Sequence, residues 1–126
     1  MSQLNAYMHF NGNCAEAMKF YQECLGGEFS MQTIGESPMA AQMPAQAHKQ
    51  VLHSILRNAN MVLMGSDMFE DMPSMGNMMS LVLVSDSIDE LRRWWTKLAA
   101  GGQVVHELKV ESFGTFGDLT DKFGVP

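Results

Sequence analysis

Histidine is the residue type in this chain whose chemistry is easiest to read from its position. His53 lies in the alternating stretch Val51–Arg57, which predicts a β-strand. An imidazole on such a strand suits a general base that removes a proton next to a carbonyl group. A single strand histidine also often hydrogen-bonds within or beside the core, so both interpretations stay open. His106 offers less, because its neighbour Glu107 points to the opposite side of the same strand.

Methionine is the second residue type that could have a chemical role, and it makes up 13 of the 126 residues. Seven of them fall in one short span: Met61, Met64, Met68, Met72, Met75, Met78 and Met79. Thioethers at this spacing could hold Cu(I). Methionine also fills gaps in cores and lines adaptable pockets, and this interpretation is favoured because no export signal accompanies the cluster. A Cu(I) binder remains the remote alternative.

The cysteines and the paired aspartates have structural interpretations. Cys14 and Cys24 are too few for a disulfide framework, and we expect both to be buried under a helix. Cys14 stands near a predicted helix N-terminus, which could lower its pKa slightly. Asp118 and Asp121 fall in or near a hairpin, where a turn or solvated role is expected.

Composition limits the class of protein. A length of 126 residues with 46% hydrophobic and 17% charged residues suits one domain or two small fused modules. The net charge of −6, with only eight Lys and Arg, argues against a nucleic-acid partner. No apolar run approaches the ~20 residues of a membrane span. We therefore expect a cytoplasmic protein without a membrane partner.

The elements that would position these residues begin with an alternating strand. Ala6, Met8 and Phe10 fall on one side of it, and Tyr7 and His9 on the other. Asn13 is then a candidate N-cap, with Glu16 at the spacing of a capping box. The sequence predicts strands at Leu4–Phe10, Glu28–Thr33, Val51–Arg57 and Met61–Met64, and a helix that begins at Cys14 and stops at Gly26-Gly27.

The same order then occurs a second time. A strand is predicted at Met79–Val84, and Ser87 with Glu90 forms a capping box that opens a second helix, which Gly101-Gly102 ends. Phe20-Tyr21 and Trp94-Trp95 occupy similar places in the two helices and are expected to anchor them against a sheet. Strands follow at Gln103–Val110 and Thr115–Thr120, with a turn at Ser112–Gly114.

This duplication predicts the fold class. We expect an α+β fold of two tandem β-α-β-β-β modules that form a curved mixed sheet around a pocket, with module 1 at about residues 1–68 and module 2 at about 78–126. Each helix covers one face of its sheet and leaves the other face to bound a cavity. Such a cavity is a natural small-molecule site.

The ordered set of motifs resembles a known superfamily. The stretch AYMHFNGNCAEAMKFY at Ala6–Tyr21 is similar to the opening module of the glyoxalase/bleomycin-resistance/dioxygenase superfamily, also called vicinal oxygen chelate. Val51–Leu56 and Val62–Asp67 resemble the third and fourth strands of its PhnB-like branch. Asp121–Gly124 resembles the closing motif Asp-Pro-Phe-Gly, from which Lys122 departs. The resemblance implies a single domain over residues 1–126, truncated before the last strand of the family pattern, and a homodimer.

The resemblance also implies where a metal would be bound. Metal-using members hold one divalent ion at four inward strand positions, which fall on Ala6, near Met64, on Ser80 and beyond Pro126. Alanine has no donor, methionine offers a soft thioether, and neutral serine is a poor ligand, whereas a catalytic site needs about three harder donors. We therefore predict no catalytic metal and no other cofactor. His9 and His53 would face inward if the strand register differs.

The predicted function is a pocket that takes a small organic ligand. The candidates for its lining are Met8, Phe10, His53, Met64, Ser80 and Val82. Whether the protein is an enzyme stays open, and no catalytic residue is assigned. The alternatives are a metal-dependent lyase, isomerase or dioxygenase with ligands elsewhere, and a drug-sequestering protein like those that confer bleomycin resistance.

Overall fold

The structure is a computed structural model that describes residues 3–42, 45–59, 61–67, 79–111 and 114–126. The chain forms two compact units, residues 1–73 and residues 74–126. Each unit has one helix and its own sheet, so the fold is of the α+β class.

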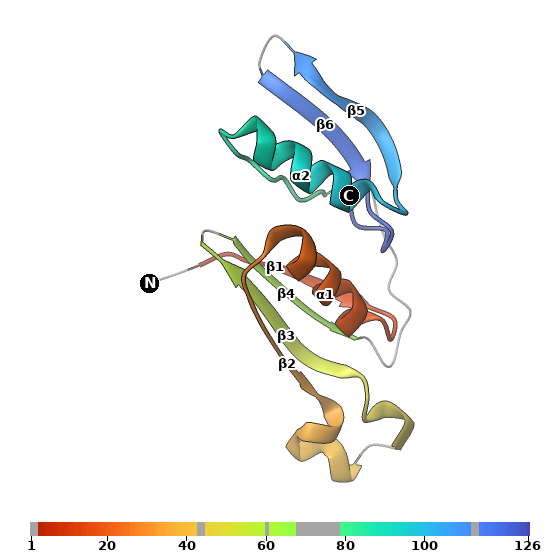
Figure 1. Ribbon diagram of the computed structural model, residues 1–126. Helices are drawn as coiled ribbons and strands as arrows, with labels where there is room; N and C mark the ends of the chain where they lie inside the picture. Colours follow the sequence, from red (N-terminus) through yellow and green to blue (C-terminus); the bar gives the residue numbers. More distant parts are fainter. Residues whose placement is uncertain (1–2, 43–44, 60, 68–78, 112–113) are drawn as a thin grey trace. The chain divides into compact units, whose positions relative to one another are not determined.

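Unit 1, residues 1–73, has the strand–helix–three-strand order that the sequence predicts for one module. Its elements are β1 (Ala6–Phe10), α1 (Cys14–Leu25), β2 (Glu28–Thr33), β3 (Val51–Asn58) and β4 (Met61–Asp67). Three short 3₁₀ helices, Ile34–Glu36, Pro38–Gln42 and Ala45–Ala47, connect β2 to β3 (Figure 1). The predicted strands and helix of this half are confirmed to within a few residues.

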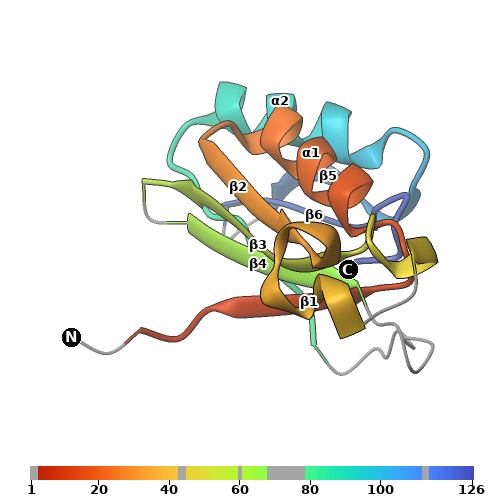
Figure 2. The same ribbon diagram turned by 90° about the horizontal axis from the view of Figure 1, so that it is seen from below.

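The strands of unit 1 form one mixed sheet in the order β1-β4-β3-β2. β1 runs parallel to β4, and the other two pairs are antiparallel. Helix α1 lies over one face of this sheet, as Figures 1 and 2 show. The core lies between them and includes Phe10, Cys14, Ala17, Met18, Tyr21, Cys24 and Leu56, all at most 7% exposed.

The start of α1 is capped by a residue from a distant strand. The Asn13 side chain makes no capping hydrogen bond. Asp67, at the end of β4, accepts hydrogen bonds from the backbone N–H of Cys14 at 2.9 Å and of Val51 at 2.8 Å. The predicted local capping box at Asn13 is therefore wrong: the buried carboxylate of Asp67 satisfies the N-terminal donor and also meets the positive end of the helix dipole.

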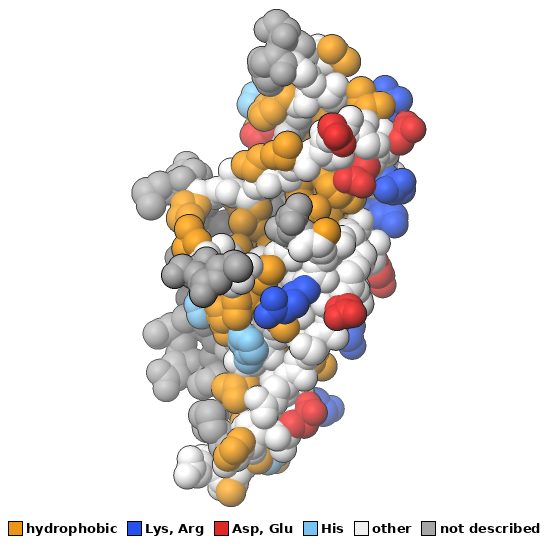
Figure 3. Space-filling model, turned by 90° about the vertical axis from the view of Figure 1, so that its left-hand side faces the viewer, with side chains coloured by type: hydrophobic (Ala, Val, Ile, Leu, Met, Phe, Trp, Pro, Cys, Tyr) orange, Lys and Arg blue, Asp and Glu red, His pale blue; other side chains and the backbone are white. Residues whose placement is uncertain are grey.

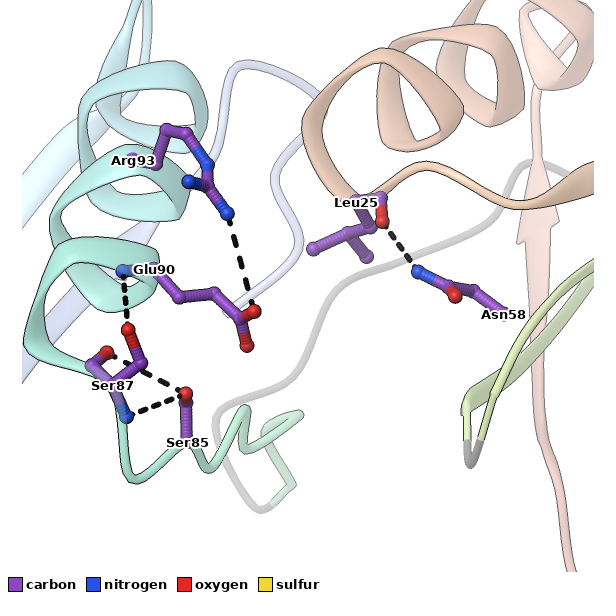
Figure 4. A network of polar contacts seen from close by, with 6 residues as sticks. All are labelled: Leu25, Asn58, Ser85, Ser87, Glu90 and Arg93. Atoms are coloured by element: carbon purple, nitrogen blue, oxygen red, sulfur yellow. Dashed lines mark hydrogen bonds and ion pairs between the residues drawn. The ribbon is translucent and has the colours of Figure 1, made fainter.

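The other end of α1 is also held by a strand. The side-chain amide of Asn58 donates to the backbone carbonyl of Leu25 (Figure 4). Asn58 belongs to the β3–β4 hairpin, where it pairs with Met61. Ala59, next in the turn, has a left-handed φ of 48°, which is uncommon for a residue other than glycine. The two strands predicted at Val51–Arg57 and Met61–Met64 therefore pair as a hairpin, which also fixes where the helix ends.

Unit 2, residues 74–126, contains α2 (Ile88–Ala99) and an antiparallel pair, β5 (Gln103–Glu111) and β6 (Gly114–Thr120). The Ser87 hydroxyl caps α2 by accepting from the backbone N–H of Glu90 at 3.3 Å (Figure 4). The Ser87 N–H donates to Ser85 Oγ at 3.0 Å, so the reciprocal half of the predicted box comes from Ser85 and not from Glu90.

Helix α2 packs on the hairpin through its aromatic pair. Trp94 is 7% exposed. A Cβ added to Gly117 of β6 would stand 2.7 Å from Cζ3 of Trp95, so the indole ring lies directly on the strand backbone. The prediction that these aromatic residues anchor the helices is confirmed for Tyr21 and Trp94, which are both buried.

The strand predicted at Met79–Val84 is wrong. Within the described part of unit 2, this segment makes one backbone hydrogen bond outside itself, from Leu81 N–H to the carbonyl of Pro126 at 3.2 Å. A strand needs a ladder of such bonds along a partner strand, and an apolar sequence by itself does not provide one. Met79, Val82 and Val84 are each more than 75% exposed.

No helix in the described ranges is long and apolar enough to cross a membrane.

Candidate functional site

The face of the unit 1 sheet that α1 leaves uncovered carries the side chains that could bind a ligand or transfer a proton. Gly65 of β4 marks the covered side, because a Cβ built on it would meet Phe10, Cys14 and Met18 at 3.3–3.4 Å. Gly65 pairs with Met8 and Ser54, so these residues also face α1. Alternation along the strands then places their neighbours on the other side.

The opposite side, which we call the open face, has an apolar centre. Tyr7, Met64 and Ile55 lie in register across β1, β4 and β3. Tyr7 is 43% exposed, whereas Met64 and Ile55 are half-buried. The amide of Asn5 lies 3.8 Å from the sulfur of Met64.

Two histidines contact Tyr7 on this face. The Tyr7 hydroxyl lies 3.4 Å from Nδ1 of His53, which is 46 residues away in the sequence. The rings of Tyr7 and His53 stack with centroids 5.9 Å apart and an interplanar angle of 29°. His9 contacts the same Tyr7 ring, with centroids 5.3 Å apart and planes tilted by 43°. In Figure 3, histidine side chains (pale blue) lie beside hydrophobic side chains (orange) on the surface.

This arrangement leaves one nitrogen of His53 for a ligand. Because Nδ1 contacts the phenol, the tautomer decides which group donates, and Nε2 is the remaining nitrogen. A Tyr7 O–H that donates to Nδ1 leaves Nε2–H as a donor, whereas the other tautomer leaves Nε2 as a base. The open face thus offers an aromatic surface, a phenol and two imidazoles.

The polar groups beneath α1 serve the fold. Ser54 Oγ donates to the carbonyl of Gly65 at 2.8 Å and contacts the thiol of Cys14 at 3.5 Å. Burial raises the pKa of the Cys14 thiol to about 11, and the Asp67 carboxylate acts in the same direction. The expectation that a helix N-terminus activates Cys14 is therefore wrong, because removal from water outweighs the dipole. Cys14 and Cys24 are both buried, as predicted, and neither forms a disulfide.

The six predicted lining residues do not gather on one face. His53 and Met64 lie on the open face, and Met8 and Phe10 lie on the α1 side of the same sheet. Ser80 and Val82 belong to unit 2, where both are exposed and neither lies in a strand. The structure therefore places the six predicted residues on two faces of the unit 1 sheet and in unit 2.

Sequence reasoning did not include Tyr7 in the lining, and it placed His9 there only for a different strand register. The two sides of β1 were separated correctly, but the more apolar side was given to the cavity. The structure gives that side to the helix, because α1 needs apolar partners for its buried stripe. The sequence did contain a signal for this surface: Tyr7 and His9 fall on the same side of β1, and His53 is a similar residue on another strand.

The donors available do not fit the metal site that the resemblance implies. Ala6 lies on the α1 side, Met64 on the open face, and Ser80 in unit 2. Among the described residues, no group of three or more His, Cys, Asp and Glu could hold a metal ion. His9 and His53 supply two imidazoles on the open face, which is fewer than the three protein ligands of a typical catalytic zinc site.

The remaining candidates have structural partners. Asp118 lies 3.5 Å from His106 across the β5–β6 pair, and both are exposed. Asp121 is buried and accepts from the backbone N–H of Phe123 at 2.8 Å and of Val125 at 3.1 Å, as expected for a turn. Of the methionine cluster, Met68, Met72, Met75 and Met78 lie outside the described residues.

An α+β chain with this sheet and surface matches one family over nearly its full length. The profile of the family described as 3-demethylubiquinone-9 3-methyltransferase matches residues 2–126. The chain belongs to this family, which is PhnB-like.

Individual relatives agree with this assignment. Protein YjdN of Escherichia coli K12 is 38% identical over 134 aligned positions, which cover 98% of this chain and 90% of YjdN. The crystal structure of PA1353 from Pseudomonas aeruginosa is 36% identical, with a TM-score of 0.85 over 99% of this chain and 93% of that one. The PhnB protein of Bacillus cereus, 24% identical, shares the fold with a TM-score of 0.78 over 98% of this chain and 95% of its own.

Proposed function

We propose that this protein binds a small organic molecule on the open face of unit 1 and that binding needs no metal ion. The contact between Tyr7 and His53 carries this proposal. This contact connects a side chain of β1 to a side chain of β3. Because Nδ1 of His53 faces the phenol, Nε2 points away from it. Membership of a PhnB-like family supports a small-molecule role, and the glyoxalase-type superfamily is the proposed wider relationship.

A role without metal follows from the chemistry of the donors. Superfamily members that use a metal rely on an ion to polarise the ligand. Here, a phenol and two imidazoles occupy the open face, and these groups form hydrogen bonds and exchange protons without an ion. They would orient a ligand through donors and the aromatic surface.

The description of the matched family names a methyltransferase, and this activity is not part of the proposal. The common nucleotide-binding arrangement is a doubly wound parallel sheet with a glycine-rich turn. Unit 1 instead has a mixed sheet with one parallel pair and a single helix on one face. A family description and a fold do not by themselves assign a reaction.

The open face has features that suit each of the two modes of action that the sequence left open. A protein that only sequesters its ligand needs an apolar, aromatic surface, which Tyr7, Ile55 and Met64 provide. An enzyme needs a titratable group beside a donor, which His53 and Tyr7 provide. The open face meets both requirements, so the proposal is limited to binding of the ligand.

Three further proposals come from the sequence and the resemblance: one domain of two modules over the whole chain, a homodimer, and a cytoplasmic location. Mass measurement in solution tests the dimer, and fractionation of cells tests the location.

A screen of small organic fragments against chelator-treated, ¹⁵N-labelled protein tests the proposed function. We expect binders to shift amide signals of β1, β3 and β4 around Tyr7, Met64 and His53. The His53→Gln variant should lose most of the affinity, whereas His106→Gln, a matched change on the β5–β6 pair, should keep it. Binding that appears only after a divalent metal is added, or that survives His53→Gln unchanged, would overturn the proposal.

A further inference from the structure

The charges on the open face differ from those of the chain as a whole. The protein has 14 acidic residues and a net charge of −6. Yet β1 and β3 contain no Asp or Glu, and the single acid of β4, Asp67, is on the α1 side and held by two backbone N–H groups. Among the described residues of these three strands, the open face therefore carries no carboxylate.

The edge strand β2 adds one acidic residue, and a basic residue of the neighbouring strand lies beside it. Glu28 lies in register with Arg57 of β3, so an acidic and a basic side chain stand next to each other at that corner of the sheet. Two titratable side chains, His9 and His53, contact the Tyr7 ring. An imidazole donates hydrogen bonds in both of its protonation states and is a cation in one of them.

The shape of the surface adds a second requirement. The exposed Tyr7 ring, with one imidazole stacked on it and another tilted against it, presents aromatic edges and faces. Met64 and Ile55 continue this surface as half-buried apolar side chains. A flat, conjugated ligand would cover such a surface best, because aromatic rings gain from stacked and edge-to-face contacts.

We propose that the ligand of the open face is a planar organic monocarboxylate, an aromatic or conjugated acid. Its ring packs on Tyr7 and Met64, and its carboxylate accepts hydrogen bonds from His9 and His53. The inference rests on the proposed function and narrows it to one chemical class. Among the described residues of β1, β3 and β4, no carboxylate on this face would repel such an anion, as acidic residues elsewhere on the protein would.

Three simple probes separate the anion from the ring: benzoate, the neutral benzyl alcohol, and the non-planar anion cyclohexanecarboxylate. Affinities are measured by NMR titration of chelator-treated, full-length protein. We expect benzoate to bind at least about tenfold more tightly than either of the others, because only benzoate has both the charge-assisted hydrogen bonds and the flat ring.

Variants assign each part of this preference to a side chain. His9→Gln and His53→Gln should reduce the preference for benzoate over benzyl alcohol, and Tyr7→Leu should reduce its preference over cyclohexanecarboxylate. Tyr7→Phe, which keeps the ring, should retain the second preference and serves if Tyr7→Leu fails to fold. His106→Gln is the control and should change neither ratio.

The possible results are distinct. If benzyl alcohol binds the open face as tightly as benzoate, the carboxylate class is overturned while the proposed small-molecule site stands. If the three probes leave the signals of β1, β3 and β4 unshifted while other fragments shift them, the class is again wrong and the site stands. If no fragment shifts those strands, both proposals fail.

Discussion

The carboxylate of Asp67 holds the backbone N–H of Cys14, the first residue of α1, from a strand that ends 53 residues later in the chain. The second oxygen holds the N–H of Val51, where β3 begins. One buried side chain thereby fixes the start of the helix and the start of a strand. The helix is held over one face of the sheet, and the other face stays open for Tyr7, His9 and His53.

The Asp67→Asn variant should lower the free energy of unfolding of unit 1 by about 2–4 kcal/mol. Asparagine has one acceptor oxygen in place of two and loses the charge that strengthens both hydrogen bonds. Urea unfolding followed by the ring signals of Tyr7 and Tyr21, the two tyrosines of the chain, measures the change. Asp89→Asn, in the exposed first turn of α2, is the control, with an expected loss below about 1 kcal/mol. Equal losses would show that the Asp67 contacts do not hold the unit together.

Cys14 should make the protein less stable in alkali. Because burial raises its pKa from 9.0 to about 11, the unfolded chain releases the thiol proton at a lower pH than the folded chain. The stabilisation is thus fully present below pH ~9 and is lost as the pH rises toward ~11, by about 1–3 kcal/mol in all. Unfolding of wild type and Cys14→Ala over this pH range measures it, because other titrating groups cancel in the difference. A difference that is independent of pH would contradict the raised pKa.

The two helices should respond differently to removal of their predicted caps. Ser87→Ala should cost unit 2 about 1 kcal/mol, because the hydroxyl accepts from Glu90 N–H. Asn13→Ala should cost unit 1 less than about 0.5 kcal/mol, because Asp67 already satisfies the start of α1. Fluorescence of Trp94 and Trp95, the two tryptophans of the chain, reports unit 2 during urea unfolding. A larger cost at Asn13 than at Ser87 would reverse the assignment of the caps.

Two glycines should be intolerant of a methyl group to different degrees. In Gly117→Ala, the new Cβ would stand 2.7 Å from the Trp95 ring and 2.9 Å from Cα of Leu108, so backbone and helix must both shift. We expect a loss near or above about 3 kcal/mol for unit 2. In Gly65→Ala the nearest atoms are 3.3–3.4 Å away and belong to side chains, so a loss of about 1–2 kcal/mol is expected. Thermal unfolding of both variants orders the two costs, and the opposite order would contradict the packing described for α2.

Much of the fold follows from local sequence. The sequence predicted β1 to β4, and only a short segment after Asn58 separates β3 from β4, so that pairing across the hairpin is set by neighbouring residues. Ser87 was predicted as a cap for the same reason, since its partner Glu90 is three residues away. Such contacts can be predicted from a sequence because the two partners are only a few residues apart.

The failures share a different origin. The cap on α1 comes from Asp67, and no local pattern connects residues that are 53 positions apart. Met79–Val84 is almost entirely apolar, as a buried strand can be, but a strand also needs a partner, which composition does not reveal.

The predicted lining residues fall on different faces for a related reason. Alternation divides β1 into two sides but does not say which side a helix covers, so Met8 and Phe10 were chosen in place of Tyr7 and His9. His53 and Met64 were placed on a lining from the sequence, and the structure shows that Tyr7 contacts His53 and lies in register with Met64. The meeting of Tyr7 with His53 depends on the strand order β1-β4-β3, which is a property of the folded sheet.

The central claim is that the open face around Tyr7 and His53 binds a small molecule without a metal. Its most direct test is the dissociation constant of the tightest fragment found, measured in chelator for wild type, His53→Gln and His106→Gln. We predict that His53→Gln weakens binding by at least about tenfold while His106→Gln leaves it unchanged. Equal affinity in all three proteins, or binding that disappears in chelator, would contradict the claim.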